Sequence, residues 1–99
     1  MFVMLEQTRI REIAKDVAAA NLPSSVVRDI LVEPGIGSRG DEILRITMVI
    51  VPDGVSRISG DASLDTLVAI QSRLRDAGEE RFPIVEYATE EELQESGDP

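Results

Sequence analysis

The chain has 99 residues, of which 19 are acidic and 10 basic, so its net charge is −9, and it contains neither cysteine nor histidine. The lack of cysteine excludes a disulfide framework and thiolate zinc sites, and the lack of histidine removes the commonest general base and metal ligand. The negative charge repels phosphate backbones and acidic membrane surfaces and favours a basic protein partner. The composition therefore disfavours an enzyme, and it makes nucleic-acid binding unlikely on electrostatic grounds.

No stretch rich in proline, glycine and serine divides the chain, and we predict a single α/β domain over residues 1–99. Residues 1–5 are apolar but lack the charged start and the cleavage site of a signal peptide. No apolar run approaches the roughly 20 residues of a membrane span. Because the chain lacks cysteine, we expect a cytoplasmic protein, and we expect it to be of bacterial type. Because its charge is negative and no membrane span is found, we expect no contact with a membrane.

The first half of the chain predicts a helix followed by a β-hairpin. Apolar residues recur at helical spacing over residues 6–20, which indicates an amphipathic helix. Residues 26–33 and 43–51 predict two strands, and the glycine-rich loop 34–41 is expected to join them as an antiparallel hairpin. The packed face of the second strand is expected to consist of Leu44, Ile46, Met48 and Ile50.

A second amphipathic helix is predicted after the turn signature at residues 52–54. Asp61 or Ser63 can cap this helix, which is expected to run to about Ala77 and to stop at Gly78. The residues expected to face inward are Leu64, Leu67, Val68, Ile70 and Leu74.

A third strand is predicted over residues 82–88, and a short helix after it because Thr89 and Glu92 have the spacing of a capping box. Residues 94–99 are expected to form a frayed acidic tail. The predicted fold class is therefore α+β, a two-layer sandwich of a three-stranded sheet with two helices on one face. The order is α-β-β-α-β plus a short C-terminal helix.

The position of the third strand is left open by the sequence. It can lie parallel beside the second strand or antiparallel beside the first. In either case a sheet this small has exposed edges, through which two copies could form a homodimer or a partner could add a strand.

Gly35, Gly37 and Gly40 have the spacing of a dinucleotide-binding fingerprint. That fingerprint needs a helix directly after the glycines, whereas a strand is predicted here. We therefore interpret the segment as a hairpin loop and expect no cofactor, with Arg39 at the loop tip as a candidate contact residue.

Asp53, Asp61 and Asp65 crowd the connection before the second helix, and neighbouring carboxylates can hold Mg²⁺ or Ca²⁺. Their spacing matches no Ca²⁺ loop, and each has an ordinary role in a turn, a cap or the first turn of a helix. We expect no metal, and a carboxylate-based divalent-metal protein is kept as an alternative.

The remaining candidate contact residues lie in the last third of the chain. Arg81, Phe82 and Tyr87 are candidates because arginine and aromatic residues dominate interface energetics, although in a small domain the aromatic pair more often anchors the edge of the core. The acidic candidates are Glu90, Glu91 and Glu92. With no catalytic residues expected, the leading hypothesis is a non-enzymatic protein-interaction or accessory module, antitoxin-like in character, with a basic partner.

The α-β-β-α-β order is topologically similar to that of type II KH-like domains. Such domains grip a nucleic-acid backbone with a G-x-x-G loop between two helices, whereas Gly78 here is followed by two glutamates. The resemblance implies an alternative function as a KH-like nucleic-acid-associated module, which the negative charge disfavours.

Overall fold

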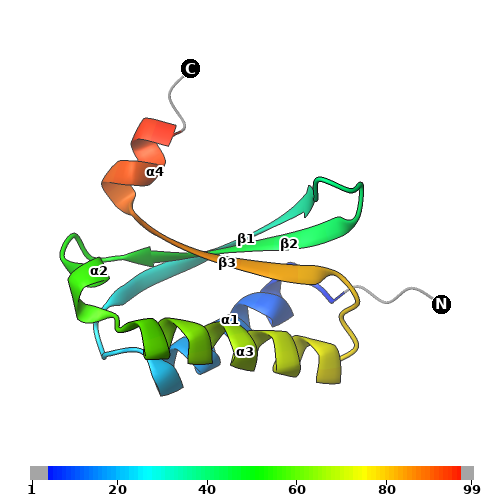
Figure 1. The fold of residues 1–99 in the computed structure, drawn as a ribbon, viewed down its shortest axis with the longest axis horizontal. Helices are drawn as coiled ribbons and strands as arrows, with labels where there is room; N and C mark the ends of the chain where they lie inside the picture. Colours follow the sequence, from blue (N-terminus) through cyan, green and yellow to red (C-terminus); the bar gives the residue numbers. More distant parts are fainter. Residues whose placement is uncertain (1–4, 97–99) are drawn as a thin grey trace.

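The computed structural model describes residues 5–96 (Figure 1). The elements in chain order are α1 (Gln7–Asn21), β1 (Val27–Ile36), β2 (Glu42–Ile50), α2 (Gly54–Arg57), α3 (Gly60–Asp76), β3 (Phe82–Thr89) and α4 (Glu90–Ser96). In the sheet, β2 lies at the centre, antiparallel to β1 and parallel to β3. Helices α1 and α3 cover one face, and α4 rises from the other side (Figure 1). The predicted fold class is confirmed, and the parallel placement of β3 resolves the open alternative.

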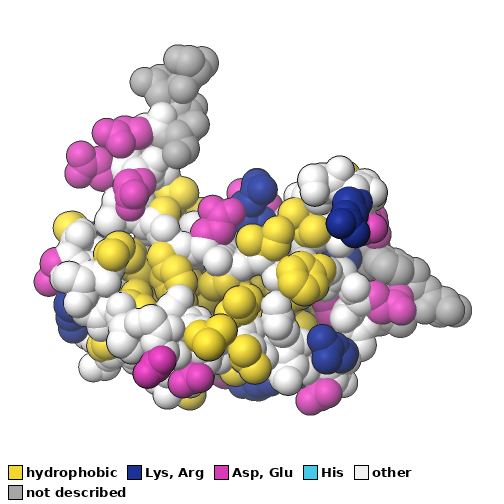
Figure 2. All heavy atoms as spheres, in the orientation of Figure 1, with side chains coloured by type: hydrophobic (Ala, Val, Ile, Leu, Met, Phe, Trp, Pro, Cys, Tyr) yellow, Lys and Arg dark blue, Asp and Glu magenta, His cyan; other side chains and the backbone are white. Residues whose placement is uncertain are grey.

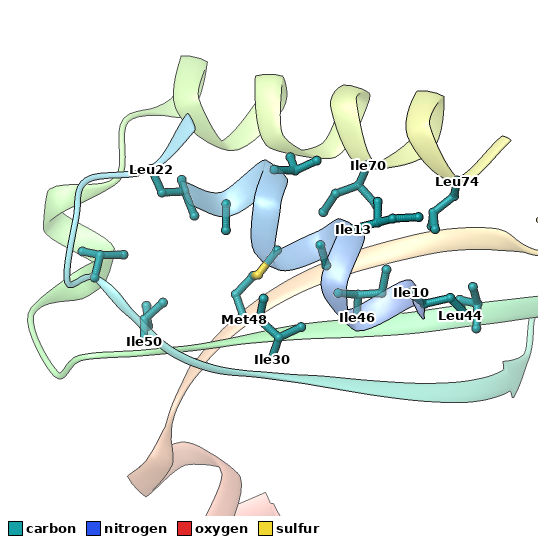
Figure 3. Close-up of a cluster of buried hydrophobic side chains, with 14 residues drawn as sticks. Ile10, Ile13, Leu22, Ile30, Leu44, Ile46, Met48, Ile50, Ile70 and Leu74 are labelled. Carbon is teal, nitrogen blue, oxygen red and sulfur yellow. The ribbon is translucent and has the colours of Figure 1, made fainter. Parts of the chain in front are cut away.

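The core lies between the sheet and the two long helices. As predicted, Leu44, Ile46, Met48 and Ile50 of β2 are almost completely buried. They pack against residues of α1 and α3 that recur at helical spacing, and these side chains fill the space between the two layers (Figure 3). The helix residues with the lowest exposure in this cluster are Ile10, Ile13, Ala14, Ile70 and Leu74.

Helix α3 begins earlier than the sequence pattern indicated. Its N-cap is Ser59, whose hydroxyl accepts a hydrogen bond from the N–H of Ala62 at 3.0 Å. The expectation that Asp61 or Ser63 caps the helix was therefore wrong, because both residues lie inside it. The chain also forms the short helix α2 in the connection before α3, where no helix was predicted. The C-terminal end agrees with prediction, since Gly78 follows the helix with a φ of 96°.

The inward face of α3 is narrower than its apolar residues suggested. Leu64 and Val68 were expected to face the core, but they are 58% and 53% exposed. The buried stripe instead consists of Thr66, Ile70 and Leu74. Thr66 can be buried because its hydroxyl donates to the carbonyl oxygen of Ala62 at 2.7 Å, which satisfies the polar group inside the helix.

Strand β1 runs three residues further than predicted and includes Pro34 and Gly35. A proline is tolerated there because β1 is an edge strand, where a missing N–H need not break the ladder. The hairpin loop is correspondingly short, and it closes with a hydrogen bond of 2.7 Å from the N–H of Gly37 to the carbonyl oxygen of Asp41.

The predicted capping box at the start of α4 is confirmed. The N–H of Thr89 donates to Glu92 Oε1 at 2.9 Å, and the N–H of Glu92 donates to Thr89 Oγ1 at 3.1 Å. The helix continues to Ser96, so residues 94–96 of the expected tail are helical, and residues 97–99 lie outside the described part.

The cap of α3 gives a direct test of this fold. We expect Ser59→Ala to lower the free energy of unfolding by about 1 kcal/mol, because the N–H of Ala62 loses its partner. Ser63→Ala, one turn inside the same helix, should change it by less than about 0.5 kcal/mol. Urea unfolding of both variants measures the difference, and equal losses would contradict the assignment of the cap.

Candidate interaction surfaces

The sheet face turned away from α1 and α3 is covered only in part, and we call it the open face. Because side chains alternate along a strand, it carries the residues that point opposite to the core. These are Leu31 and Glu33 of β1, Ile43, Arg45, Thr47 and Val49 of β2, and Phe82, Ile84, Glu86 and Ala88 of β3.

Helix α4 stands over one end of the open face. There it borders a shallow groove of about 540 Å³, lined by Arg28, Asp29, Leu31, Val49, Glu90, Leu93 and Gln94. The capping box fixes where α4 leaves β3, and an ion pair of 2.7 Å between Arg28 and Glu90 joins α4 to β1. Both members of that pair are more than half exposed, so the pair orients the helix more than it stabilises the protein.

The charge on α4 is entirely acidic. Glu90, Glu91 and Glu92 occupy its first turn, where negative charge is favourable beside the free N–H groups of a helix. Glu91 and Glu95 are one helical turn apart, exposed, and form no ion pair with other residues of the described range. Figure 2 shows acidic side chains gathered on α4, on the side of the helix turned away from the hollow above the sheet.

The floor of the open face is partly apolar. Leu31, Phe82 and Ile84 are 38%, 58% and 36% exposed, which is high for side chains of this size. Between them Arg45 forms a cross-strand ion pair of 2.8 Å with Glu86. The open face therefore combines a partly apolar floor with an acidic helix at one end, whose Glu90, Leu93 and Gln94 line the groove.

Arg81, a sequence-based candidate, is engaged inside the protein. Its side chain is 10% exposed and is bound to the fully buried carboxylate of Glu79, with an Nε to Oε2 distance of 2.9 Å. Glu79 also accepts hydrogen bonds from the N–H groups of Leu5 at 2.9 Å and Arg81 at 2.8 Å. Arg81 thus fastens the segment before α1 to the segment before β3 and is not offered to a partner.

Burial acts against the ionised form of Glu79, but the bonds that its carboxylate accepts are stronger in effect. Desolvation alone would raise the pKa of Glu79, whereas the Arg81 side chain and the two backbone N–H groups lower it, and the net pKa lies below its ordinary value. The same pair raises the pKa of Arg81. Glu79 was not among the predicted site residues, because nothing in the polar segment after α3 distinguishes a buried glutamate from the residues around it.

The two aromatic candidates of β3 do not act together. Phe82 and Tyr87 are an odd number of residues apart in one strand, so their side chains lie on opposite faces of the sheet. Phe82 belongs to the open face, while Tyr87 packs against the core. The Tyr87 hydroxyl is buried and has no hydrogen-bond partner among the described residues.

The last of the predicted site residues, Arg39, is exposed in the hairpin loop. This loop lies at the opposite end of the sheet from α4 (Figure 1). Of the predicted interaction residues, the structure therefore brings together only the three glutamates of α4, while Arg39, Arg81, Phe82 and Tyr87 lie apart from them.

A second groove, of about 560 Å³, lies between α1 and β1. Its lining mixes cationic and anionic side chains, among them Arg11, Lys15, Arg28, Glu12 and Asp29. Arg11 is ion-paired with Asp29, and hydrogen bonds from the N–H of Ile30 and from Arg11 lower the pKa of Asp29. Because its charges largely compensate one another, this groove selects neither sign of ligand.

Within residues 5–96, no three acidic side chains gather closely enough to hold a metal ion. Asp53 precedes α2, and Asp61 lies in the first turn of α3.

A KH-like domain would need a G-x-x-G loop between two helices. Among the described residues, the one connection between consecutive helices joins α2 to α3. It consists of Ile58 and Ser59 and has no G-x-x-G sequence.

None of the helices in the described part of the chain is long and apolar enough to cross a membrane. Comparisons of the chain with protein-family models, with curated proteins and with solved structures found no match.

The buried ion pair leads to a prediction on acid stability. Because the pKa of Glu79 is lowered on folding, its ionised form stabilises the protein above the ordinary pKa of 4.5, and this stabilisation is lost as the pH falls through the lowered pKa. We expect Glu79→Gln to lower the free energy of unfolding by about 3 kcal/mol at neutral pH, because the buried Arg81 cation loses its anionic partner. The stability of this variant should also depend less on pH in acid than that of the unchanged protein.

Glu86→Gln is the matched control, because it removes the partner of an exposed arginine and should cost less than about 1 kcal/mol. Urea unfolding at neutral pH and below pH 4.5 measures both variants. If both variants lose a similar free energy of unfolding, the buried Glu79–Arg81 pair is no more important for stability than the exposed pair.

The unpaired hydroxyl of Tyr87 predicts a stabilising substitution. Tyr87→Phe removes a buried polar group that lacks a partner, and we expect the free energy of unfolding to rise by about 1 kcal/mol. A shift of the urea midpoint with an unchanged slope would measure this gain. A loss of stability would mean that the hydroxyl is hydrogen-bonded in solution.

Proposed function

We propose that this protein is a non-enzymatic interaction module that binds a basic segment of a partner protein on the open face, against α4. The observation that carries this proposal is the position of α4, an acidic helix held over a sheet face whose floor is apolar. Glu91 and Glu95 offer two carboxylates on one side of that helix, outside the lining of the groove, and neither has an ion-pair partner within residues 5–96.

Charge and apolar area have different roles in this proposal. The acidic helix and the net charge of −9 attract a cationic partner over a distance and raise its rate of association. The exposed side chains of Leu31, Phe82 and Ile84 supply the apolar contact that holds the complex once it has formed.

A non-enzymatic role is supported by the chain's acid–base chemistry. Without histidine or cysteine, a general base would have to be a carboxylate whose pKa is raised toward neutrality, or a lysine or tyrosine whose pKa is lowered toward it. The pKa values of Glu79 and Asp29 are shifted in the opposite direction, because the backbone N–H of Ile30 and the Arg11 side chain donate to Asp29, and the Arg81 side chain and two backbone N–H groups outweigh the desolvation of Glu79. These groups stabilise the fold and do not exchange protons near neutral pH.

The chemistry of such a module fits an accessory protein of the cytoplasm, for example one that covers the basic site of a partner as an antitoxin does. The absence of cysteine suits a reducing compartment. An acidic helix beside an apolar floor would compete for a cationic surface in the way a polyanion does.

The test is affinity purification of the tagged protein from its native cell, with mass spectrometry of what elutes. We expect a stoichiometric basic partner that is released by salt. With the variant Glu91→Gln/Glu95→Gln, the amount of partner that co-purifies should fall by about tenfold or more, because the electrostatic attraction from α4 is lost.

The control variant Glu12→Gln/Asp65→Asn removes the same charge from exposed positions on α1 and α3 and should bind like the unchanged protein. Equal retention by all three proteins, or the absence of any stoichiometric partner, would contradict binding at α4.

A further inference from the structure

The two edges of the sheet differ in how well they are protected. Edge strand β1 carries a register irregularity between Val27 and Asp29, and the N–H of Ile30 is already bound by the Asp29 carboxylate at 2.8 Å. Pro34, further along β1, has no N–H to donate. Bulges, charges and prolines are the devices by which proteins keep edge strands from pairing.

Edge strand β3 lacks these devices along most of its length. Its single charged residue, Glu86, is neutralised by Arg45 on the open face, and its proline stands at the second position. The free edge of β3 is therefore the one that can accept another strand.

An apolar stripe on α3 lies on the same side of the molecule as this edge. Arg73 of α3 reaches Asp16 of α1 at 3.9 Å, which identifies the flank of α3 that faces α1. At about 100° per residue, Leu64 lies opposite Arg73 around the helix, and Val68 lies beside Leu64. Since α1 packs on β1 and α3 on β3, the exposed Leu64 and Val68 border the free edge of β3. Figure 2 shows hydrophobic side chains gathered over α3 and β3.

We infer that the occupant of this surface is a second copy of the chain, related by a two-fold axis perpendicular to the sheet. The two β3 strands would pair antiparallel into a continuous six-stranded sheet, and the two α3 helices would pack antiparallel beneath it. The inference stands independently of the proposed function, which concerns the open face.

The direction of the backbone groups of β3 supports edge pairing. The N–H of Arg81 is bound by Glu79 and that of Thr89 by Glu92, so neither is directed into the ladder with β2. Because N–H groups point to alternate sides along a strand, the odd-numbered residues of β3 direct theirs to the free edge. Pro83 has no N–H, which leaves Val85 and Tyr87 as the donors of that edge.

One register of two β3 strands uses both donors without placing like charges together. With Val85 opposite Val85 of the second copy, Val85 exchanges two hydrogen bonds across the axis, and Tyr87 donates to the carbonyl oxygen of Pro83. Glu86 then lies opposite Ile84. A shift that centres the pairing on Glu86 would place two glutamates directly opposite each other, which is destabilising.

The charges of α3 are arranged for the same axis. Val68 is the middle residue of Gly60–Asp76, and the middle of Phe82–Thr89 falls beside Val85, so one axis can pass through both elements. Asp61 and Arg75 each lie seven residues from Val68. Seven residues are about two helical turns, so all three side chains lie on nearly the same face of α3. Antiparallel packing about Val68 therefore brings Asp61 of each copy to Arg75 of the other. Both side chains are exposed and lack an ion pair within the described part of the chain.

The test measures mass by light scattering after size exclusion, over a range of concentrations of the full chain. We expect twice the 10.8 kDa of one chain. Leu64→Glu/Val68→Asp should raise the dissociation constant of the dimer by about 100-fold or more, since it places charges in the contact. The monomer should stay folded by circular dichroism, because both positions are exposed in a single chain.

Ile36→Asp is the control, since it places a charge at an apolar position with 69% exposure on the protected strand β1. The mass should not change in this variant. A chain that is monomeric at all concentrations, or a dimer that is lost in Ile36→Asp and kept in Leu64→Glu/Val68→Asp, would overturn the inference.

A charge exchange tests the geometry. Arg75→Glu and Asp61→Arg should each weaken the dimer by about tenfold, and the double variant should restore it, because the pair is re-formed with reversed sign. Failure of the double variant to restore the dimer would overturn the antiparallel packing about Val68. None of these substitutions touches α4, so the outcome is separate from the test of the open face.

Discussion

The central position of β2 is the constraint on which the rest of the molecule depends. One face of this strand buries Leu44, Ile46, Met48 and Ile50 almost completely, and a sheet of three strands has room for two helices over that face. Both long helices therefore lie on one side of the sheet, because each packs its apolar stripe against this buried face of β2. The other face of the sheet and the free edge of β3 remain available, and both proposed interactions involve these regions.

The two available surfaces are geometrically coupled. A two-fold axis perpendicular to the sheet leaves the helical layer of both copies on one side and both open faces on the other. In such a dimer the two α4 helices rise from the same side, at opposite ends of a six-stranded floor. A basic partner would then meet a partly apolar surface with an acidic helix at each end, which increases avidity when the partner presents two cationic segments.

The sequence predicted the fold where local chemistry determines the structure. The alternation along β2, the spacing of Thr89 and Glu92, and the stop at Gly78 each depend on neighbours in the chain, and each is confirmed. The inward face of α3 could not be predicted in this way, because Leu64 and Val68 have the same pattern as core residues. Their exposure results from the width of the sheet, which ends at β3 and leaves that flank of α3 without a neighbour. Glu79 was missed for a related reason, since its burial depends on Leu5, at the other end of the chain.

The same bonds that terminate β3 also limit how many copies can associate. Glu79 satisfies the N–H before the strand and Glu92 the N–H at its end, so the free edge is short, and pairing about Val85 uses both of its donors. The opposite edge is obstructed at Ile30 and Pro34. A chain with one competent edge and one protected edge forms a closed pair, whereas two competent edges would allow an open-ended fibre. The proposed self-complementary pairing of β3 would thus reconcile an exposed strand edge with a discrete assembly.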